Sequence, residues 1–130
     1  MAEQIAKFRL ASFSILKSLI EVKEGVEINN KLSVDFKQTS GINEAEHKFK
    51  YTFEIVVTDE NNALNINVVM NGFFEFDQDI DEKMRASFFN VNAPAILFPY
   101  VRAHITTLTS LSGIKPIILP TLNLSSRNEQ

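Results

Sequence analysis

Three aspartates, Asp77, Asp79 and Asp81, stand at alternate positions, which is the spacing of the first ligands in a calcium-binding loop. Such a loop also needs a glycine at its sixth position and a bidentate glutamate at its twelfth. This sequence has Glu82 and Phe88 at those positions. A carboxylate can instead cap a helix, and Glu82 follows Asp79 by three residues, as in a capping box. The spacing therefore predicts the start of a helix rather than a metal site.

Side chains that could serve acid–base or nucleophilic catalysis are sparse. The two histidines, His47 and His104, have no carboxylate or histidine neighbours at metal-ligand spacing, and the sequence contains no cysteine. Glu44 and Glu46 are interpreted as loop charges. Neither a G-x-S-x-G nucleophile motif nor a phosphate-binding loop is present. Because catalysis needs convergent polar groups, the sequence predicts a protein that is not an enzyme and that uses no cofactor and no metal.

Composition narrows the class of partner. The 130 residues are 45% hydrophobic, carry a formal net charge of −3 and include 11 phenylalanines. Lysine and arginine form no cluster that would neutralise phosphates, which argues against nucleic acid as a partner. No apolar run approaches the roughly 18 residues of a membrane-spanning helix, and the first ten residues lack the apolar core of a secretory signal. We therefore expect a cytoplasmic protein without direct membrane insertion.

Apolar and polar residues alternate through the first part of the chain, which is the pattern of half-buried strands. The alternation predicts four strands, over residues 7–21, 31–38, 48–58 and 63–76. A change of phase near Ala11 predicts a β-bulge. Gly72 predicts a bulge or the close approach of another part of the backbone. Residues 39–47 are polar and are predicted to form a loop.

The second part of the chain has helical periodicity. One helix is predicted from Asp79 to about Asn90, and a second from Asn92 to Gly113. Residues 114–124 contain two prolines and are predicted to form an extended arm over the sheet or over a neighbouring subunit. Strands followed by helices indicate the α+β class. We expect a four-stranded antiparallel sheet with two helices packed on one side.

Residues 94–106 read PAILFPYVRAHIT, in which two prolines flank an apolar helical turn. This segment resembles the signature helix of the SecB family of protein-export chaperones, and residues 110–124 resemble the extended segment that follows it. The resemblance implies a single SecB-like domain over residues 1–130 and a homotetramer built as a dimer of dimers. It also implies an ATP-independent molecular chaperone that binds unfolded or precursor polypeptides in apolar grooves for export, with SecA as a further partner.

The resemblance also indicates candidate site residues. Alternate apolar residues of the second strand match the family's groove, although they suit an intramolecular core equally well, and Leu64 falls near the groove position of the fourth strand. Absence of the family's further helix would leave the groove more open, or would require the C-terminal arm, including Ile118, to line it. The expected client-binding residues are Leu32, Val34, Phe36, Leu64, Ile117, Leu119 and Leu122. The expected subunit interface lies on the second helix and consists of Ile96, Tyr100, Val101, His104 and Leu108.

The sequence departs from the family pattern at positions that bear on SecA. Asn67 and Lys17 align where the family has carboxylates that contact the motor, although Glu21 is near the second position. The sequence ends six residues after Leu124, so we expect the family's C-terminal helix and SecA-contacting tail to be missing. Client holding is thus better supported than SecA coupling. Two alternatives stay open: a dedicated chaperone of one partner protein, such as an antitoxin, and a carrier of a small apolar ligand.

Overall fold

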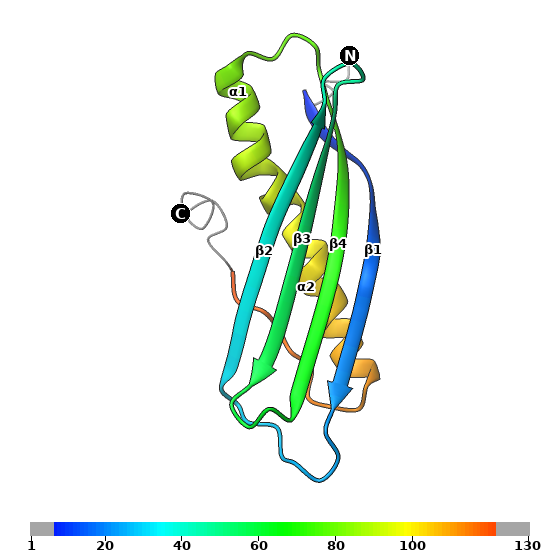
Figure 1. The fold of residues 1–130 in the computed structure, drawn as a ribbon, viewed down its shortest axis with the longest axis vertical. Coiled ribbons are helices and arrows are strands. Elements are labelled where there is room, and N and C mark those ends of the chain that lie inside the picture. Colours follow the sequence, from blue (N-terminus) through cyan, green and yellow to red (C-terminus); the bar gives the residue numbers. More distant parts are fainter. Residues whose placement is uncertain (1–6, 122–130) are drawn as a thin grey trace, which may run out of the picture.

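A four-stranded antiparallel sheet carries one helical layer on one of its faces in the computed structural model, which describes residues 7–121 (Figure 1). The order of the strands in the sheet is β1-β4-β3-β2. The first strand therefore lies beside the fourth, and β1 and β2 are the two edge strands. The strands are β1 (Phe8–Val22), β2 (Leu32–Asn43), β3 (Lys48–Asp59) and β4 (Leu64–Phe76). The α+β class and the four-stranded antiparallel sheet are confirmed.

The second strand is longer than its sequence predicts. Residues 39–43, expected in a loop, continue β2 and pair with residues 48–52 of β3. These residues were assigned to a loop because they are polar. One face of this sheet is solvated, however, so strand residues that point outward can be polar. The loop is reduced to the tight turn over residues 44–47.

The first strand contains two irregularities of register. One lies between Leu10 and Ser12, which confirms the bulge predicted near Ala11, and another lies between Ile15 and Lys17. Each shift adds one residue to β1 relative to β4 and therefore changes which face the following side chains occupy.

The helical layer is one joined region rather than two separate helices. It consists of α1 (Glu82–Ser87), a π-helical stretch η1 (Phe88–Asn92) and α2 (Ala93–Leu111). Asn92 has helical backbone angles and makes no side-chain cap, so the second helix does not begin afresh there. The helix that contains Pro94 and Pro99 thus continues directly from the turns before it.

The N-terminal cap of α1 is Asp81 rather than the predicted Asp79. The Asp81 carboxylate accepts a hydrogen bond from the backbone N–H of Met84 at 2.7 Å, which satisfies a donor of the first helical turn. Asp79 forms an ion pair with Lys7 at 3.0 Å, and this pairing lowers the pKa of its carboxyl group.

The core lies between the sheet and α2. Leu97 and Ile105 of α2 are fully buried, and α2 packs on β4, β1 and β3. A Cβ atom on Gly72 of β4 would lie 2.9 Å from Phe74 Cε1 and 3.1 Å from Leu97 Cδ1. Glycine at this position therefore leaves room for the Leu97 side chain of α2, whereas the prediction was a bulge or the close approach of another part of the backbone. The buried side chains of the two central strands are Phe49, Tyr51, Phe53, Ile55, Val57, Leu64, Ile66, Val68, Met70, Phe74 and Phe76.

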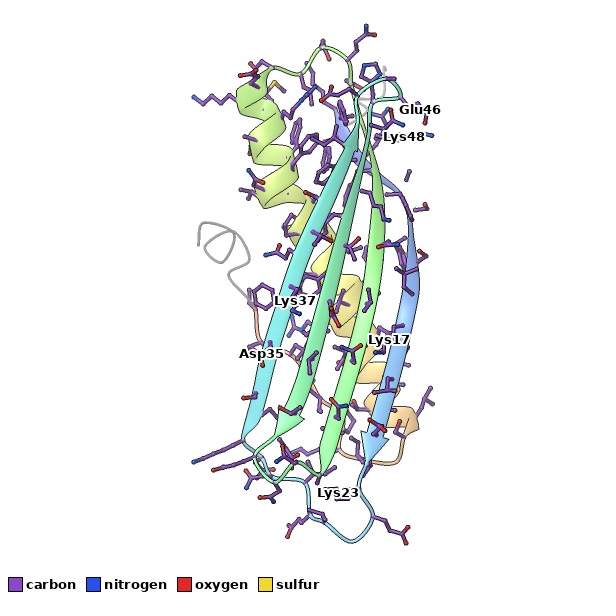
Figure 2. The ribbon with its side chains drawn as sticks, viewed as in Figure 1. Lys17, Lys23, Asp35, Lys37, Glu46 and Lys48 are labelled. Carbon is purple, nitrogen blue, oxygen red and sulfur yellow. The ribbon has the colours of Figure 1, made fainter. Side chains whose placement is uncertain are left out.

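The opposite face of the sheet is largely polar (Figure 2). Lys17 of β1 and Lys37 of β2 lie on this face, in one row across the strands with Glu54 between them. The amide of Asn67 donates to Glu54 Oε2 at 3.0 Å. No helix in the described part of the chain is long and apolar enough to cross a membrane.

Candidate functional site

The helical layer covers the sheet unevenly. α2 packs mainly on β4, β1 and β3, so the β2 side of the same face is bordered by other parts of the chain. One of these is the segment 114–121, which returns from the end of α2 toward β2 (Figure 1). The other is the connection 23–31 between β1 and β2. The candidate site lies between these two segments and the edge strand.

Two threonines of α2 hold the returning segment in place. Thr106 Oγ1 donates to the Ile117 carbonyl oxygen at 2.8 Å, and the Ile117 N–H donates to Thr109 Oγ1 at 2.9 Å. Thr109 is fully buried. Thr106 and Thr109 therefore anchor the arm to α2. The arm packs on its own subunit, because Ile117 and Leu119 belong to the core.

Replacing Thr109 with valine is expected to loosen the arm. Valine retains the shape of the side chain but leaves the buried N–H of Ile117 without its acceptor, which costs about 1–3 kcal/mol. Hydrogen exchange should show faster exchange at Ile117, and the free energy of unfolding should fall. Thr107→Val, at an exposed position of the same helix, is the control. Equal protection of Ile117 in both variants would contradict the anchoring role.

The connection between β1 and β2 is held by a buried carboxylate at the end of β3. Asp59 accepts hydrogen bonds from the backbone N–H groups of Asn29, Ala63 and Leu64, at 2.8, 2.7 and 2.9 Å. Burial alone would raise the pKa of Asp59, but these hydrogen bonds outweigh it and lower the pKa below the ordinary value. One side chain thus closes the β3–β4 turn and fixes the connection beside the site.

Stability should depend on pH through Asp59. Because folding lowers its pKa, the stabilisation is fully present above the unfolded pKa of about 3.9 and is lost as the pH falls through the folded value. We expect the melting temperature of the wild type to fall below about pH 4. Asp59→Asn should be less stable at neutral pH and less sensitive to acid. Parallel acid dependence of melting in both proteins would contradict this assignment.

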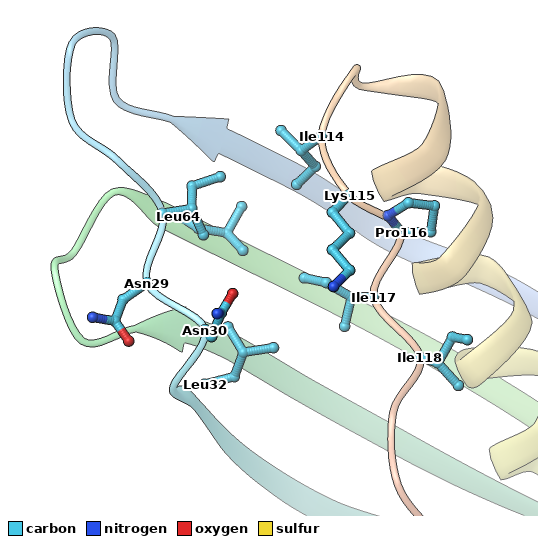
Figure 3. A pocket seen from close by; sticks show the side chains of 10 residues that line it. Asn29, Asn30, Leu32, Leu64, Ile114, Lys115, Pro116, Ile117 and Ile118 are labelled. Carbon is cyan, nitrogen blue, oxygen red and sulfur yellow. The ribbon is translucent and has the colours of Figure 1, made fainter.

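An apolar pocket of about 310 Å³ lies where these segments meet (Figure 3). Leu64 forms part of its buried floor, and Leu32, at the start of β2, is 40% exposed at its edge. The amides of Asn29 and Asn30 contribute polar atoms. The lining residues are Ile28, Asn29, Asn30, Leu32, Leu64, Ile114, Lys115, Pro116, Ile117 and Ile118.

The structure brings part of the expected client-binding set together. Leu32, Leu64 and Ile117 line the pocket. Val34 and Phe36 continue the row of Leu32 along β2 and are half-buried against the core, where the Phe36 ring lies 5.4 Å from that of Phe53.

Leu119 and Leu122 complete the expected client-binding set. Leu119 is only 1% exposed, so it is a core residue and not part of an open groove. The alternation of the arm turns Leu119 inward and Ile118, which is 68% exposed, outward. Leu122 lies outside the described residues. Sequence reasoning also missed Ile28 and Ile114, because a residue in a connection carries no periodic signal that it faces a pocket.

Four of the expected interface residues recur at every fourth position of α2, and the fifth does not share their surface. Val101 is fully buried and packs against the sheet, so its assignment to a subunit interface is corrected to the core. Tyr100 is exposed and its ring lies 4.6 Å from that of Phe13 on β1. His104 Nε2 is hydrogen-bonded to Ser18 Oγ at 2.7 Å. The half-buried residues of the set are Ile96, His104 and Leu108.

The site has the chemistry of a binding surface. Its lining combines aliphatic side chains with two amides and the ammonium group of Lys115. In the part of the chain that the structure describes, no group of three histidine, cysteine or acidic residues could hold a metal ion. The pocket can therefore bury apolar side chains and offer a few hydrogen bonds.

Comparison with known proteins finds a matching family model and several related proteins. The family model described as preprotein translocase subunit SecB matches residues 11–127. An uncharacterized protein of Methanocaldococcus jannaschii is 32% identical over 115 residues, which cover 85% of this chain and 72% of that protein. The protein-export protein SecB of Orientia tsutsugamushi is 28% identical over 104 residues, or 80% of this chain and 64% of that protein. The chain thus spans slightly less than two thirds of this SecB relative.

Solved structures share the fold. A SecB-like chaperone of Mycobacterium tuberculosis, in complex with a ChAD peptide from an antitoxin, matches with a TM-score of 0.74 at 14% identity, covering 90% of this chain and 88% of that one. A protein of unknown function from Streptococcus agalactiae matches with a TM-score of 0.54 at 10% identity, covering 88% and 97%. Since the family model extends over most of the sequence and the fold agrees with it, this chain belongs to the SecB family.

Proposed function

We propose that this protein is an ATP-independent chaperone that holds unfolded or precursor polypeptides, in protein export, by binding their apolar segments along β2. The proposal rests on the pocket beside the edge strand β2, on the face of the sheet that carries the helices. Leu32 lines the pocket, and Val34 and Phe36 follow it on the same face of β2. The neighbouring elements β3 and α2 leave these three side chains only partly covered. Family membership supports the same assignment.

Physical chemistry accounts for holding without a nucleotide. Burial of apolar surface contributes roughly 25 cal/mol per Å² and makes no demand on the order of residues in the client. An open, aliphatic pocket therefore binds segments that are apolar and extended, and these are exposed in unfolded chains. A folded client hides the same segments in its own core, so release needs only that the client folds or is taken over elsewhere.

Assembly and location follow the family in this proposal. We infer a cytoplasmic homotetramer, built as a dimer of dimers, in which the exposed Tyr100 and the half-buried Ile96, His104 and Leu108 lie near the contacts between subunits. Several exposed apolar side chains on β1, among them Phe13 and Ile15, support an assembled state.

Two positions on the outer face of the sheet bear on coupling to SecA. Lys17 and Asn67 occupy the outer face, where the family resemblance calls for carboxylates, and Lys37 adds a second positive charge to the row of Lys17. This charge pattern favours a second candidate function, in which the protein serves one dedicated partner, such as an antitoxin, rather than general export. Binding of purified SecA, compared between the wild type and Lys17→Glu, would separate the two.

Dilution of a chemically unfolded client tests the proposed function. Light scattering is followed with and without the full chain, in the absence of ATP, for several unrelated clients. Suppression of aggregation at near-stoichiometric amounts of the protein is expected. Failure with every unrelated client would remove the general holding function, and suppression with a single client would identify a dedicated partner.

A further inference from the structure

One charged side chain lines the apolar pocket, and its charge is not compensated. Lys115 belongs to the arm, and it is the only ionised side chain among the lining residues. Its ammonium group forms no ion pair and no hydrogen bond within residues 7–121. The methylene groups of a lysine side chain can add apolar surface to the wall that carries it. The pocket therefore places an unpaired positive charge beside surface that apolar client groups would cover.

An amide without a partner lies on the other wall of the same pocket. Asn30, in the connection between β1 and β2, is exposed and has no hydrogen bond in the described part of the chain. Asn29 differs, because its amide oxygen accepts from the Lys31 N–H at 2.8 Å. In Figure 3 the Lys115 side chain extends from the arm toward the pocket and away from α2, and the Asn30 amide lies across the pocket from it. Both groups are therefore available to a ligand.

The walls of the pocket offer no repulsion to an anion, since none of the described residues that line it is acidic. The carboxylate of Asp59 is close to the connection, but it is buried. Its oxygens accept three backbone N–H groups, from Asn29, Ala63 and Leu64. This carboxylate is thus satisfied within the chain, and the positive charge of Lys115 is left for a group from outside.

We propose that Lys115 and Asn30 bind the carboxylate of an acidic side chain in the client, so that the pocket selects apolar segments that carry a glutamate or an aspartate. The inference rests on the proposed holding function and names the class of segment that binds best. A carboxylate accepts hydrogen bonds at both oxygens, and ammonium and amide groups both donate them. Charge-assisted hydrogen bonds are stronger than neutral ones, and apolar client groups that exclude water strengthen them further. A basic side chain at the same place would be repelled.

The exposed apolar residues at the edge of the pocket set the spacing in the client. Leu32 follows Asn30 by two residues, which span at most about 7 Å. Ile118 follows Lys115 by three residues, which span at most about 11 Å. An extended client presents alternate side chains to one face, about 7 Å apart. Its acidic side chain should therefore stand two positions from the apolar anchor.

Two peptides that differ by one isosteric side chain test the carboxylate site. Both have apolar side chains at alternate positions, blocked termini and the same fluorescent label. Two positions from the central leucine, one has glutamate and the other glutamine. Fluorescence anisotropy with the full chain at low ionic strength should give a dissociation constant about fivefold lower for the glutamate peptide. Because salt screens partly exposed charges, this ratio should fall below about twofold in about 0.5 M salt.

Four variants separate the site from the general charge of the protein. Lys115→Gln should abolish the preference and leave the affinity for the glutamine peptide within about twofold of the wild type, because most of the apolar stem is kept. Lys115→Glu should reverse the preference, so that a peptide with lysine at the variable position binds better than the glutamate peptide. Asn30→Ala should reduce the ratio to about twofold. Lys83→Gln, at an exposed position of α1 that does not line the pocket, removes the same charge and should keep the fivefold ratio.

Equal binding of the two peptides by the wild type would overturn the carboxylate site and leave the proposed function in place. Absence of binding by both peptides would overturn the proposed function together with the site. Loss of the preference in Lys83→Gln as well as in Lys115→Gln would assign it to the overall field of the protein and count against the site. A glutamine peptide with a free C-terminal carboxylate is the last comparison. If it bound more tightly than the glutamate peptide, the site would recognise chain ends, and the assignment to acidic side chains would be wrong.

Discussion

Truncation of Leu97 to alanine should lower the free energy of unfolding by about 2–5 kcal/mol, the range found for buried leucines that leave a cavity. Leu97 is fully buried and touches the strand at the one place where glycine admits the helix, because its Cδ1 lies 3.1 Å from the position of a Cβ on Gly72. Protein interiors are close-packed, so the site cannot collapse easily around the missing methyl groups.

Leu111→Ala provides the matched control for this substitution. Leu111 ends the same helix but is 82% exposed, and its truncation should change the free energy of unfolding by no more than about 0.5 kcal/mol. Chemical denaturation followed by circular dichroism measures both. Similar stabilities of the two variants would mean that α2 does not pack on the sheet through Leu97.

Replacement of Leu32 and Ile118 together by aspartate should weaken the binding of an apolar peptide by at least tenfold, and the folded state should persist. Both side chains line the pocket and both are partly exposed in the free protein, so that each has surface left to bury against a client. Loss of that burial, at roughly 25 cal/mol per Å², and the introduction of two hydrated carboxylates both act against an apolar ligand.

Val91→Asp combined with Leu111→Asp makes the same change in charge at two exposed apolar positions that do not line the pocket. This control should bind the peptide as the wild type does. Isothermal titration or fluorescence anisotropy would give the dissociation constants, and thermal melting would verify the fold. If the control lost affinity to the same degree, general electrostatics rather than the pocket would explain the result.

Local patterns in the sequence predicted the sheet well. Strict alternation places apolar side chains on one face of β3, and the change of phase in β1 marks its bulge. Gly72 was expected to mark a bulge or a close backbone approach, and in the structure it leaves room for the side chain of Leu97. SecB family members are chaperones rather than enzymes, so family membership agrees with the prediction of a non-catalytic protein.

Properties that depend on packing were harder to predict. Helical periodicity identified a row on α2 but not which side of that row meets the sheet, so Val101 was assigned to an interface although it is buried. Leu119 was assigned to the client groove for a similar reason. Two prolines remove the periodicity that would separate inward from outward positions in the arm. Thr109 accepts a hydrogen bond from the arm, and Asp59 accepts one from the β1–β2 connection. Both bonds join segments far apart in the sequence, so no local pattern predicts them.

Site-specific photo-crosslinking tests the central claim, that unfolded clients bind along β2 on the helix-bearing face, most directly. A benzoylphenylalanine is placed at Ile118, beside the pocket, and in a second protein at Lys50 on the opposite face of the sheet. Each protein is irradiated with an unfolded client in the absence of ATP. We expect strong crosslinking from position 118 that an excess of apolar peptide suppresses, and little crosslinking from position 50. Strong crosslinking from position 50 with none from position 118 would contradict it.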